Sequence, residues 1–142
     1  MKNVGISKMK KIIEKIKAKI RGTIDLERLI KDGLSVGDNF HAQEGVIIDP
    51  GHCWLIEIGN NVTLAPRVHI LAHDASTKNI LGYTKISNVK IGNNVFVGAG
   101  TIILPGVTIE DNVIIGAGSV VTKDCKEGVY AGNPCTLVLS LI

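Results

Sequence analysis

Aliphatic side chains recur at every sixth position between residues 91 and 126, and this period constrains the fold more than any other feature of the chain. A period of six matches neither the 3.6 residues of an α-helical turn nor the alternation of a β-strand. It fits a chain that turns a corner every six residues, so that each aliphatic side chain points inward, near the one three corners earlier. The spacing therefore predicts an all-β solenoid, a triangular parallel β-helix with coils of about 18 residues. Small or β-branched residues follow four positions after each member of the register, which consists of Ile91, Val97, Ile103, Ile109, Ile115 and Val121.

The same register extends back to residue 36 with two interruptions. A first coil begins near Val36 and a second at Ile58, separated by a phase break at 54–57. After Asp74 the period stops, and residues 76–88 follow no six-residue pattern, which predicts a loop ejected from the solenoid. Long loops in compact repeat domains are commonly functional or mobile. Because the six-residue register begins near Val36, we expect an N-terminal helical segment and cap at 1–33 and a β-helical domain at 34–142.

A short basic amphipathic helix is expected at residues 8–21, where one methionine and four isoleucines recur at helical spacing among seven lysine and arginine residues. Two interpretations of its apolar stripe are open. The helix binds a membrane surface or a partner, or it packs on the β-helical body or on a neighbouring subunit. Gly22 breaks this helix, and Asp25 and Gly33 are placed to cap and to end a second one that closes the solenoid.

The composition agrees with a single narrow β-helical domain. The chain has 142 residues and only five aromatic side chains, and its net charge of +3 is more than accounted for by the N-terminal segment. The body therefore lacks the basic surface of a nucleic-acid-binding protein. Its three cysteines lie far apart and form no zinc motif, and no apolar stretch has the length of a signal peptide or membrane span. These features predict reduced thiols and a cytoplasmic location.

Several ordered motifs resemble those of the hexapeptide-repeat acyltransferases. They are Ile91-Gly92-Asn93-Asn94-Val95, Ile103-Leu104-Pro105-Gly106-Val107, the segment from Ile115 to Asp124, and Ala131-Gly132-Asn133-Pro134. The resemblance covers residues 36–136. Within the family, the chain resembles most specifically the branch of maltose/galactoside and surface-polysaccharide O-acetyltransferases. It implies a left-handed β-helix, a homotrimer with active sites between subunits, and transfer of an acetyl group from acetyl-CoA to a sugar hydroxyl or, less readily, an amine. That reaction requires no metal.

A histidine base is the central requirement of such a reaction, because a sugar hydroxyl must lose its proton as it attacks a thioester. His73 lies at the mouth of the ejected loop and matches the family's catalytic histidine. His52 stands 21 residues earlier, so the two can lie on adjacent coils, where His52 would orient His73 or line the acceptor pocket. The resemblance also places Gln43 and Asp49 against the sugar. The family has asparagine at the first position, and Asp49 is equally interpretable as a turn residue.

The coenzyme is expected along the regular coils. Ala99 and Ala117 match positions where small side chains admit the pantetheine arm, and the Ala99 N–H is a candidate oxyanion donor by resemblance. Thr122 and Lys123 match coenzyme contacts, with the lysine suited to phosphate. Cys135 and Thr136 stand where the family often has a basic residue, so one phosphate contact is missing or supplied from elsewhere.

Two functions other than acetyl transfer are open alternatives. A β-helical zinc carbonic anhydrase needs three converging histidines, of which His69 and His73 offer two with unsuitable spacing. A non-enzymatic scaffold would use the basic helix to tether partners. The identity of the acceptor is open, because acceptor pockets are built from loops that do not repeat.

Overall fold

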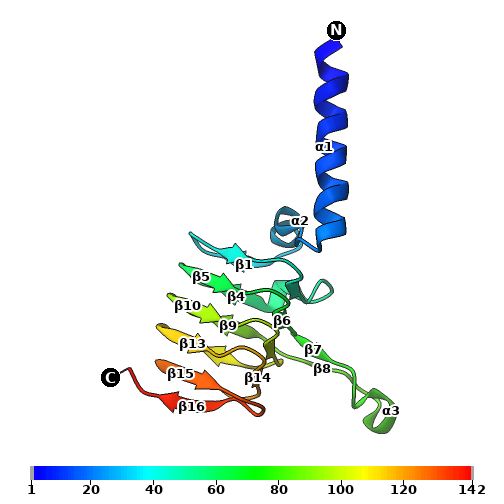
Figure 1. Ribbon diagram of the computed structural model, residues 1–142. Helices are drawn as coiled ribbons and strands as arrows, with labels where there is room; N and C mark the ends of the chain where they lie inside the picture. Colours follow the sequence, from blue (N-terminus) through cyan, green and yellow to red (C-terminus); the bar gives the residue numbers. More distant parts are fainter. Residues whose placement is uncertain (1, 142) are drawn as a thin grey trace.

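Short parallel strands form three sheets in the computed structural model, which describes residues 2–141, with side chains from Gly5 onward (Figure 1). The chain visits the sheets in turn, and each strand pairs with one from the preceding coil, which gives a three-sided parallel β-helix. The first sheet contains β1 (Ser35–Val36), β4 (Ile56–Ile58), β9 (Val89–Ile91) and β12 (Thr108–Ile109). The second contains β2 (His41–Ala42), β5 (Val62–Leu64), β10 (Val95–Val97), β13 (Val113–Ile115), β15 (Gly128–Ala131) and the antiparallel β16 (Thr136–Leu139). The third contains β3 (Ile47–Ile48), β6 (His69–Ile70), β11 (Ile102–Ile103) and β14 (Val120–Val121).

The six-residue register forms the core, as predicted. All six aliphatic residues between 91 and 121, and the six that follow them by four positions, are at most 2% exposed. Ile91 pairs with Ile109, and Val97 with Ile115, so regular coils are 18 residues apart. Burial of each such side chain contributes about 1.5–3 kcal/mol, which makes the aliphatic stack the main stabilising element of the fold.

The two interruptions lengthen two coils without disturbing the stack. Val36 pairs with Ile58, 22 residues away, and the extra four residues are absorbed around a 3-10 turn, η1 (Cys53–Leu55). Ile58 pairs with Ile91, 33 residues away, because the segment after Asp74 leaves the solenoid. This excursion is more ordered than a plain loop: β7 (His73–Asp74) pairs antiparallel with β8 (Lys85–Ile86), and α3 (Lys78–Leu81) lies between them.

Asparagines line the corner between the first two sheets. Asn39, Asn61, Asn94 and Asn112 all adopt the left-handed conformation, with φ between 55° and 58°. Their side-chain amides form a ladder: Asn39 donates to Asn61, Asn61 to Asn94 and Asn94 to Asn112, at 2.9 to 3.1 Å. Asparagine tolerates this conformation better than most residues, and here it also connects the coils.

Replacement of Asn61 tests the contribution of this ladder. Asn61→Ala is expected to lower the free energy of unfolding by about 1–3 kcal/mol, because alanine is strained at positive φ and two amide hydrogen bonds are lost. Asn61→Gly loses the same hydrogen bonds but accepts the conformation, so its loss should be clearly smaller. Denaturant unfolding monitored by circular dichroism measures both, and equal losses would show that the left-handed backbone is unimportant.

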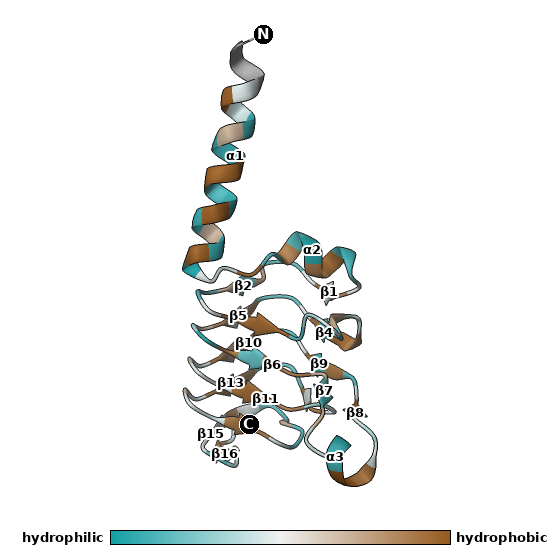
Figure 2. Ribbon diagram, turned by 90° about the vertical axis from the view of Figure 1, so that its right-hand side faces the viewer, coloured by the Kyte–Doolittle hydropathy of each residue, from teal (hydrophilic) through white to brown (hydrophobic). Residues whose placement is uncertain are grey.

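Two helices precede the first coil. The longer, α1 (Lys2–Arg21), projects away from the sheets, and its apolar bands are visible in Figure 2. The shorter, α2 (Leu26–Lys31), is capped by Asp25, which accepts a hydrogen bond from the Arg28 N–H, and it buries Leu29 against the core. The expectation that α1 packs on its own β-helical body is wrong, because its isoleucines are 44–80% exposed. No helix among the described residues is long and apolar enough to cross a membrane.

Candidate active site

Asp49 is the buried centre of a polar cluster at the corner between the third and first sheets. It follows β3 in the Asp-Pro-Gly segment and is only 1% exposed. Its Oδ1 accepts hydrogen bonds from the N–H groups of Gly51 and His52, at 3.1 and 3.2 Å, which closes its own turn. Its Oδ2 reaches the next coil and accepts the Ala72 N–H at 3.1 Å. The carboxylate therefore connects two coils beneath the base of the ejected hairpin.

His73 lies directly above this carboxylate. Its Nδ1 forms a hydrogen bond with Asp49 Oδ2, and its side chain remains 37% exposed. The Ser87 N–H donates to the Ala72 carbonyl at 3.0 Å, so both ends of the hairpin are fixed beside the histidine. The sequence left two interpretations of Asp49 open, a sugar contact and a turn residue. The structure shows a carboxylate that closes its own turn and is enclosed by backbone N–H groups and by His73.

Asp49 is ionised, and this sets the tautomer of His73. Burial opposes its charge, but the hydrogen bonds from His73 and from the Ala72 N–H outweigh that effect and lower the pKa of the carboxyl below its ordinary value of 3.8. An ionised carboxylate can only accept hydrogen bonds, so Nδ1 of His73 carries the proton. In the neutral imidazole the other ring nitrogen, Nε2, then carries a lone pair and can accept a proton from a substrate.

The lowered pKa of Asp49 predicts how stability changes in acid. Because the folded state holds this carboxyl ionised below its unfolded pKa, its contribution is complete above about pH 3.8 and is lost as pH falls through the lower folded value. The wild-type protein should therefore lose more stability between pH 4 and pH 2.5 than Asp49→Asn. Thermal unfolding midpoints of both proteins across this range measure the difference, and parallel curves would contradict it.

His52 lies beside His73, as the spacing of the two residues suggested. Their ring centroids are 4.6 Å apart and tilted by 36°. His52 Nδ1 is buried with no hydrogen-bond partner among the described residues, and it lies 3.6 Å from Asp49 Oδ1. A small displacement of the ring would bring this nitrogen within hydrogen-bond distance of the carboxylate. His52 therefore lies against both members of the Asp49–His73 pair, with its ring beside His73 and its Nδ1 near Asp49.

Asp49, His52 and His73 also form the one group among the described residues that brings three potential metal-ligand atoms close together. One ligand atom from each lies within 4.8 Å of the others. His69, which the carbonic anhydrase hypothesis requires, is on β6 and is not part of this group. A site of three histidines is therefore not formed among the described residues of one chain.

The remaining predicted residues occupy two different corners. Thr122 and Lys123 follow β14 and lie on the same corner as Asp49, further along the stack of coils. Gln43, Ala99 and Ala117 lie on the corner between the second and third sheets, after β2, β10 and β13. Within one chain, the expected coenzyme residues are thus divided between the corner that carries His73 and a second corner.

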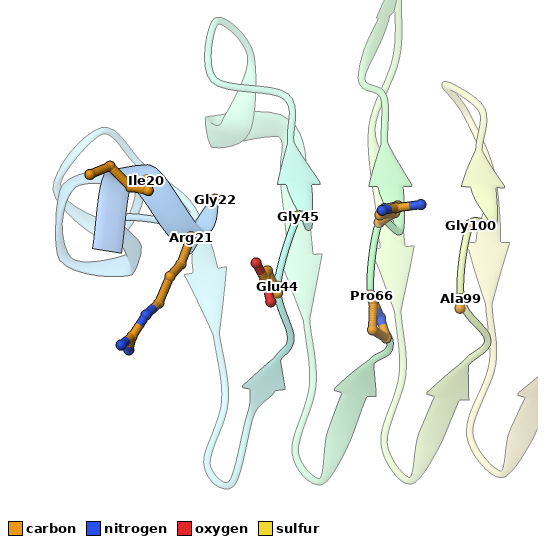
Figure 3. A pocket seen from close by; sticks show the side chains of 9 residues that line it. Ile20, Arg21, Gly22, Glu44, Gly45, Pro66, Ala99 and Gly100 are labelled. Atoms are coloured by element: carbon orange, nitrogen blue, oxygen red, sulfur yellow. The ribbon is translucent and has the colours of Figure 1, made fainter. Parts of the chain in front are cut away.

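A groove of about 650 Å³ follows this second corner (Figure 3). It extends from the end of α1, at Arg21, to Ala99, with Glu44 and Pro66 on the coils between them. Arg67 also lines it and adopts φ 62°, although a glycine occupies the same corner position in three other coils. Sequence reasoning missed this arginine. The signal was an Ala-Pro-Arg corner in place of the Gly-Ala-Gly that recurs at 98–100 and 116–118.

Comparisons with known proteins agree with this architecture. Residues 88–123 match the family described as bacterial transferase hexapeptide (six repeats). The crystal structure of a maltose O-acetyltransferase from Clostridium difficile 630 superimposes with a TM-score of 0.65 and 33% identity, covering 93% of this chain and 86% of that one.

The chain belongs to the hexapeptide-repeat acyltransferases.

Two further relatives define its place among the hexapeptide-repeat acyltransferases. Protein CapG of Staphylococcus aureus is 50% identical over 93 residues, which cover 62% of this chain and 54% of CapG. A galactoside acetyltransferase, solved in complex with coenzyme A, is 32% identical with a TM-score of 0.59, covering 82% of this chain and 70% of that one. The chain spans about half the length of the curated relatives it matches.

Proposed function

We propose that this hexapeptide-repeat protein transfers an acetyl group from acetyl-CoA to a hydroxyl, less readily an amine, of a sugar or polysaccharide precursor. The observation that carries the proposal is the Asp49–His73 pair, a histidine with one ring nitrogen free at the base of the ejected hairpin. Similarity to a maltose O-acetyltransferase and to a galactoside acetyltransferase in complex with coenzyme A supports the choice of acyl donor and acceptor class.

The reaction uses His73 twice. Its Nε2 takes the proton of the acceptor hydroxyl while the oxygen attacks the thioester carbonyl, which forms the new C–O bond. The Asp49 carboxylate stabilises the resulting imidazolium through Nδ1. Collapse of the tetrahedral intermediate breaks the C–S bond, and the imidazolium returns its proton to the leaving thiolate. The Ala99 N–H is the proposed donor to the oxyanion.

A site between subunits brings the divided residues together. In a homotrimer of left-handed β-helices, the corner with His73, Thr122 and Lys123 of one subunit would face the corner with Ala99 and Ala117 of its neighbour. Both substrates would bind together in a ternary complex at this interface, without a metal. Gln43 and His52 would line the acceptor side, and Lys123 would contact a coenzyme phosphate.

The proposal also covers the division of the chain into domains, the role of helix α1 and the location of the protein. Residues 34–142 would form the catalytic domain, and residues 1–33 an N-terminal segment whose helix α1 contacts a neighbouring subunit, a partner or a membrane surface. The protein would act in the cytoplasm. The exposed isoleucines of α1 support a binding role for this helix, since they are not covered by the chain's own sheets.

A thiol-release screen tests the proposal. Acetyl-CoA and the purified protein are incubated with a panel of maltosides, galactosides, amino sugars and nucleotide sugars, and free coenzyme A is detected with a disulfide reagent. We expect release that depends on one acceptor class, and sedimentation as three copies of the 15.1 kDa chain. Failure to bind acetyl-CoA at millimolar concentration by calorimetry would refute the acyltransferase assignment.

A further inference from the structure

Arg67 occupies a position where the fold otherwise uses glycine. Gly45, Gly100 and Gly118 hold this corner position in other coils, with φ from 69° to 75°, whereas Arg67 adopts φ 62°. The four residues are equivalent in hydrogen bonding, since each donates its N–H to the carbonyl of the neighbouring corner, at 2.8 to 3.0 Å. A residue other than glycine, asparagine or aspartate is strained in this conformation. Such strain concentrates at functional sites, and here it places a guanidinium on the groove.

The side chain of Arg67 passes close to the adjacent coil at Gly45. A Cβ on Gly45 would lie 3.1 Å from Arg67 Cγ, so the glycine allows the arginine to cross the adjacent coil. Arg21 also lines this groove, and Glu44 is the acidic residue in the lining (Figure 3). Neither arginine forms a side-chain ion pair with any residue the structure describes. The lining thus contains two guanidinium groups, unpaired among the described residues, and one carboxylate, which gives the groove excess positive charge.

The direction of the coenzyme places this charge on the acceptor side. Under the proposed function, acetyl-CoA lies from Ala99 through Ala117 towards the coil that carries Thr122 and Lys123. Arg67 is one coil from Ala99 in the opposite direction, and Arg21 is further away still, beside Gly22, whose carbonyl accepts the Gly45 N–H. The arginines therefore lie beyond the reacting thioester, away from the proposed phosphate contacts.

We infer that Arg67, with Arg21, binds an anionic group of the acceptor, a carboxylate or a phosphate. The planar guanidinium donates two parallel hydrogen bonds to either group, which suits Arg67 to selecting a charged sugar over a neutral one. This inference rests on the proposed function and narrows its substrate class. A coenzyme phosphate has the same chemistry, and the experiment below separates the two sources.

The test uses matched acceptors that differ in one charged group. Methyl glucoside is compared with methyl glucuronide and with glucose 1-phosphate, both as acceptors of acetyl transfer and as ligands in calorimetry with coenzyme A present. In the wild type we expect the charged compounds to bind at least tenfold more tightly than methyl glucoside. Arg67→Gly should remove this preference, while Arg67→Lys retains part of it. Arg28→Ala, which changes an exposed arginine on α2 that is paired with Asp32, is the matched control and should retain all of the preference.

The outcomes separate the inference from the proposed function. Arg67→Gly should fold at least as well as the wild type, since glycine fits φ 62°, so a loss of binding reflects the lost side chain. An increase in the KM for acetyl-CoA, with charged acceptors unaffected, would assign Arg67 to a coenzyme phosphate and overturn the inference. Equal binding of charged and neutral sugars by the wild type would also overturn it. Selective anion binding without acetyl transfer would support the anion site and reject the proposed reaction.

Discussion

His73→Ala is expected to lower kcat for acetyl transfer by about a thousandfold, the largest effect of any single substitution in the site. His73 is the residue with a free ring nitrogen held beside an ionised carboxylate at the base of the hairpin, and general bases contribute about 10²–10⁴-fold to such reactions. Removal of this side chain also takes one hydrogen bond from the buried Asp49 carboxylate, so the variant should lose some folding stability, which thermal unfolding measures separately from activity. Steady-state kinetics with the acceptor found by the thiol-release screen measure the loss.

His41→Ala provides the matched control for this substitution. His41 is an exposed histidine on β2 whose Nε2 is hydrogen-bonded to Asn39 at 2.9 Å, on a different corner from Asp49. Its activity should remain within twofold of the wild type. The KM for acetyl-CoA should be similar in both variants, because neither histidine is a proposed coenzyme contact. Full activity of His73→Ala would exclude this histidine as the base.

Asp49→Asn is expected to lower kcat by about 10²–10³-fold, no more than His73→Ala, although the residue does not reach the substrate. The carboxylate accepts the Nδ1 proton of His73, whereas an asparagine amide can donate to Nδ1 and thereby favour the tautomer whose Nε2 is already protonated. In a serine protease the equivalent substitution lowers kcat by about 10⁴-fold for this reason. A loss in kcat with little change in either KM would agree with a positioning role.

Asp74→Asn separates this effect from a general loss of negative charge near the histidine. Asp74 follows His73 directly, is exposed, and accepts a hydrogen bond from the Ser76 N–H at 2.8 Å. That hydrogen bond lowers the pKa of the Asp74 carboxyl, so this residue is also ionised at neutral pH. Its amide variant should keep kcat within threefold. A comparable loss in both variants would indicate that nearby charge, and not the Asp49 hydrogen bond, determines the rate.

The fold could be predicted from the sequence wherever one physical requirement repeats. Every coil must fill the same narrow interior, so Ile91 and the residues at six-position intervals after it identify the core and the 18-residue coil directly. The segments that interrupt the six-residue repeat were harder to predict. The hairpin formed by β7 and β8 depends on pairing between Asp74 and Lys85, which no local pattern indicates.

The site was predictable in its residues more than in their roles. His73 and His52 could be placed together by counting residues per coil, because the counting depends only on the repeat. The role of Asp49 could not, since Asp-Pro is equally a turn signal, and only the structure shows Oδ2 reaching the next coil. Arg67 was missed because its position is recognised as unusual only when it is compared with the glycines at the equivalent corner of the other coils.

A double-mutant cycle on Asp49 and His73 tests the central claim most directly. If Asp49 acts only by positioning His73, then kcat of Asp49→Asn/His73→Ala should equal that of His73→Ala within about twofold, because residues that act as a unit are not additive. Rates of acetyl transfer from radiolabelled acetyl-CoA give the three variant values and the wild-type reference. Losses that multiply, so that the double variant is slower than His73→Ala by the full effect of Asp49→Asn, would contradict an Asp49–His73 base.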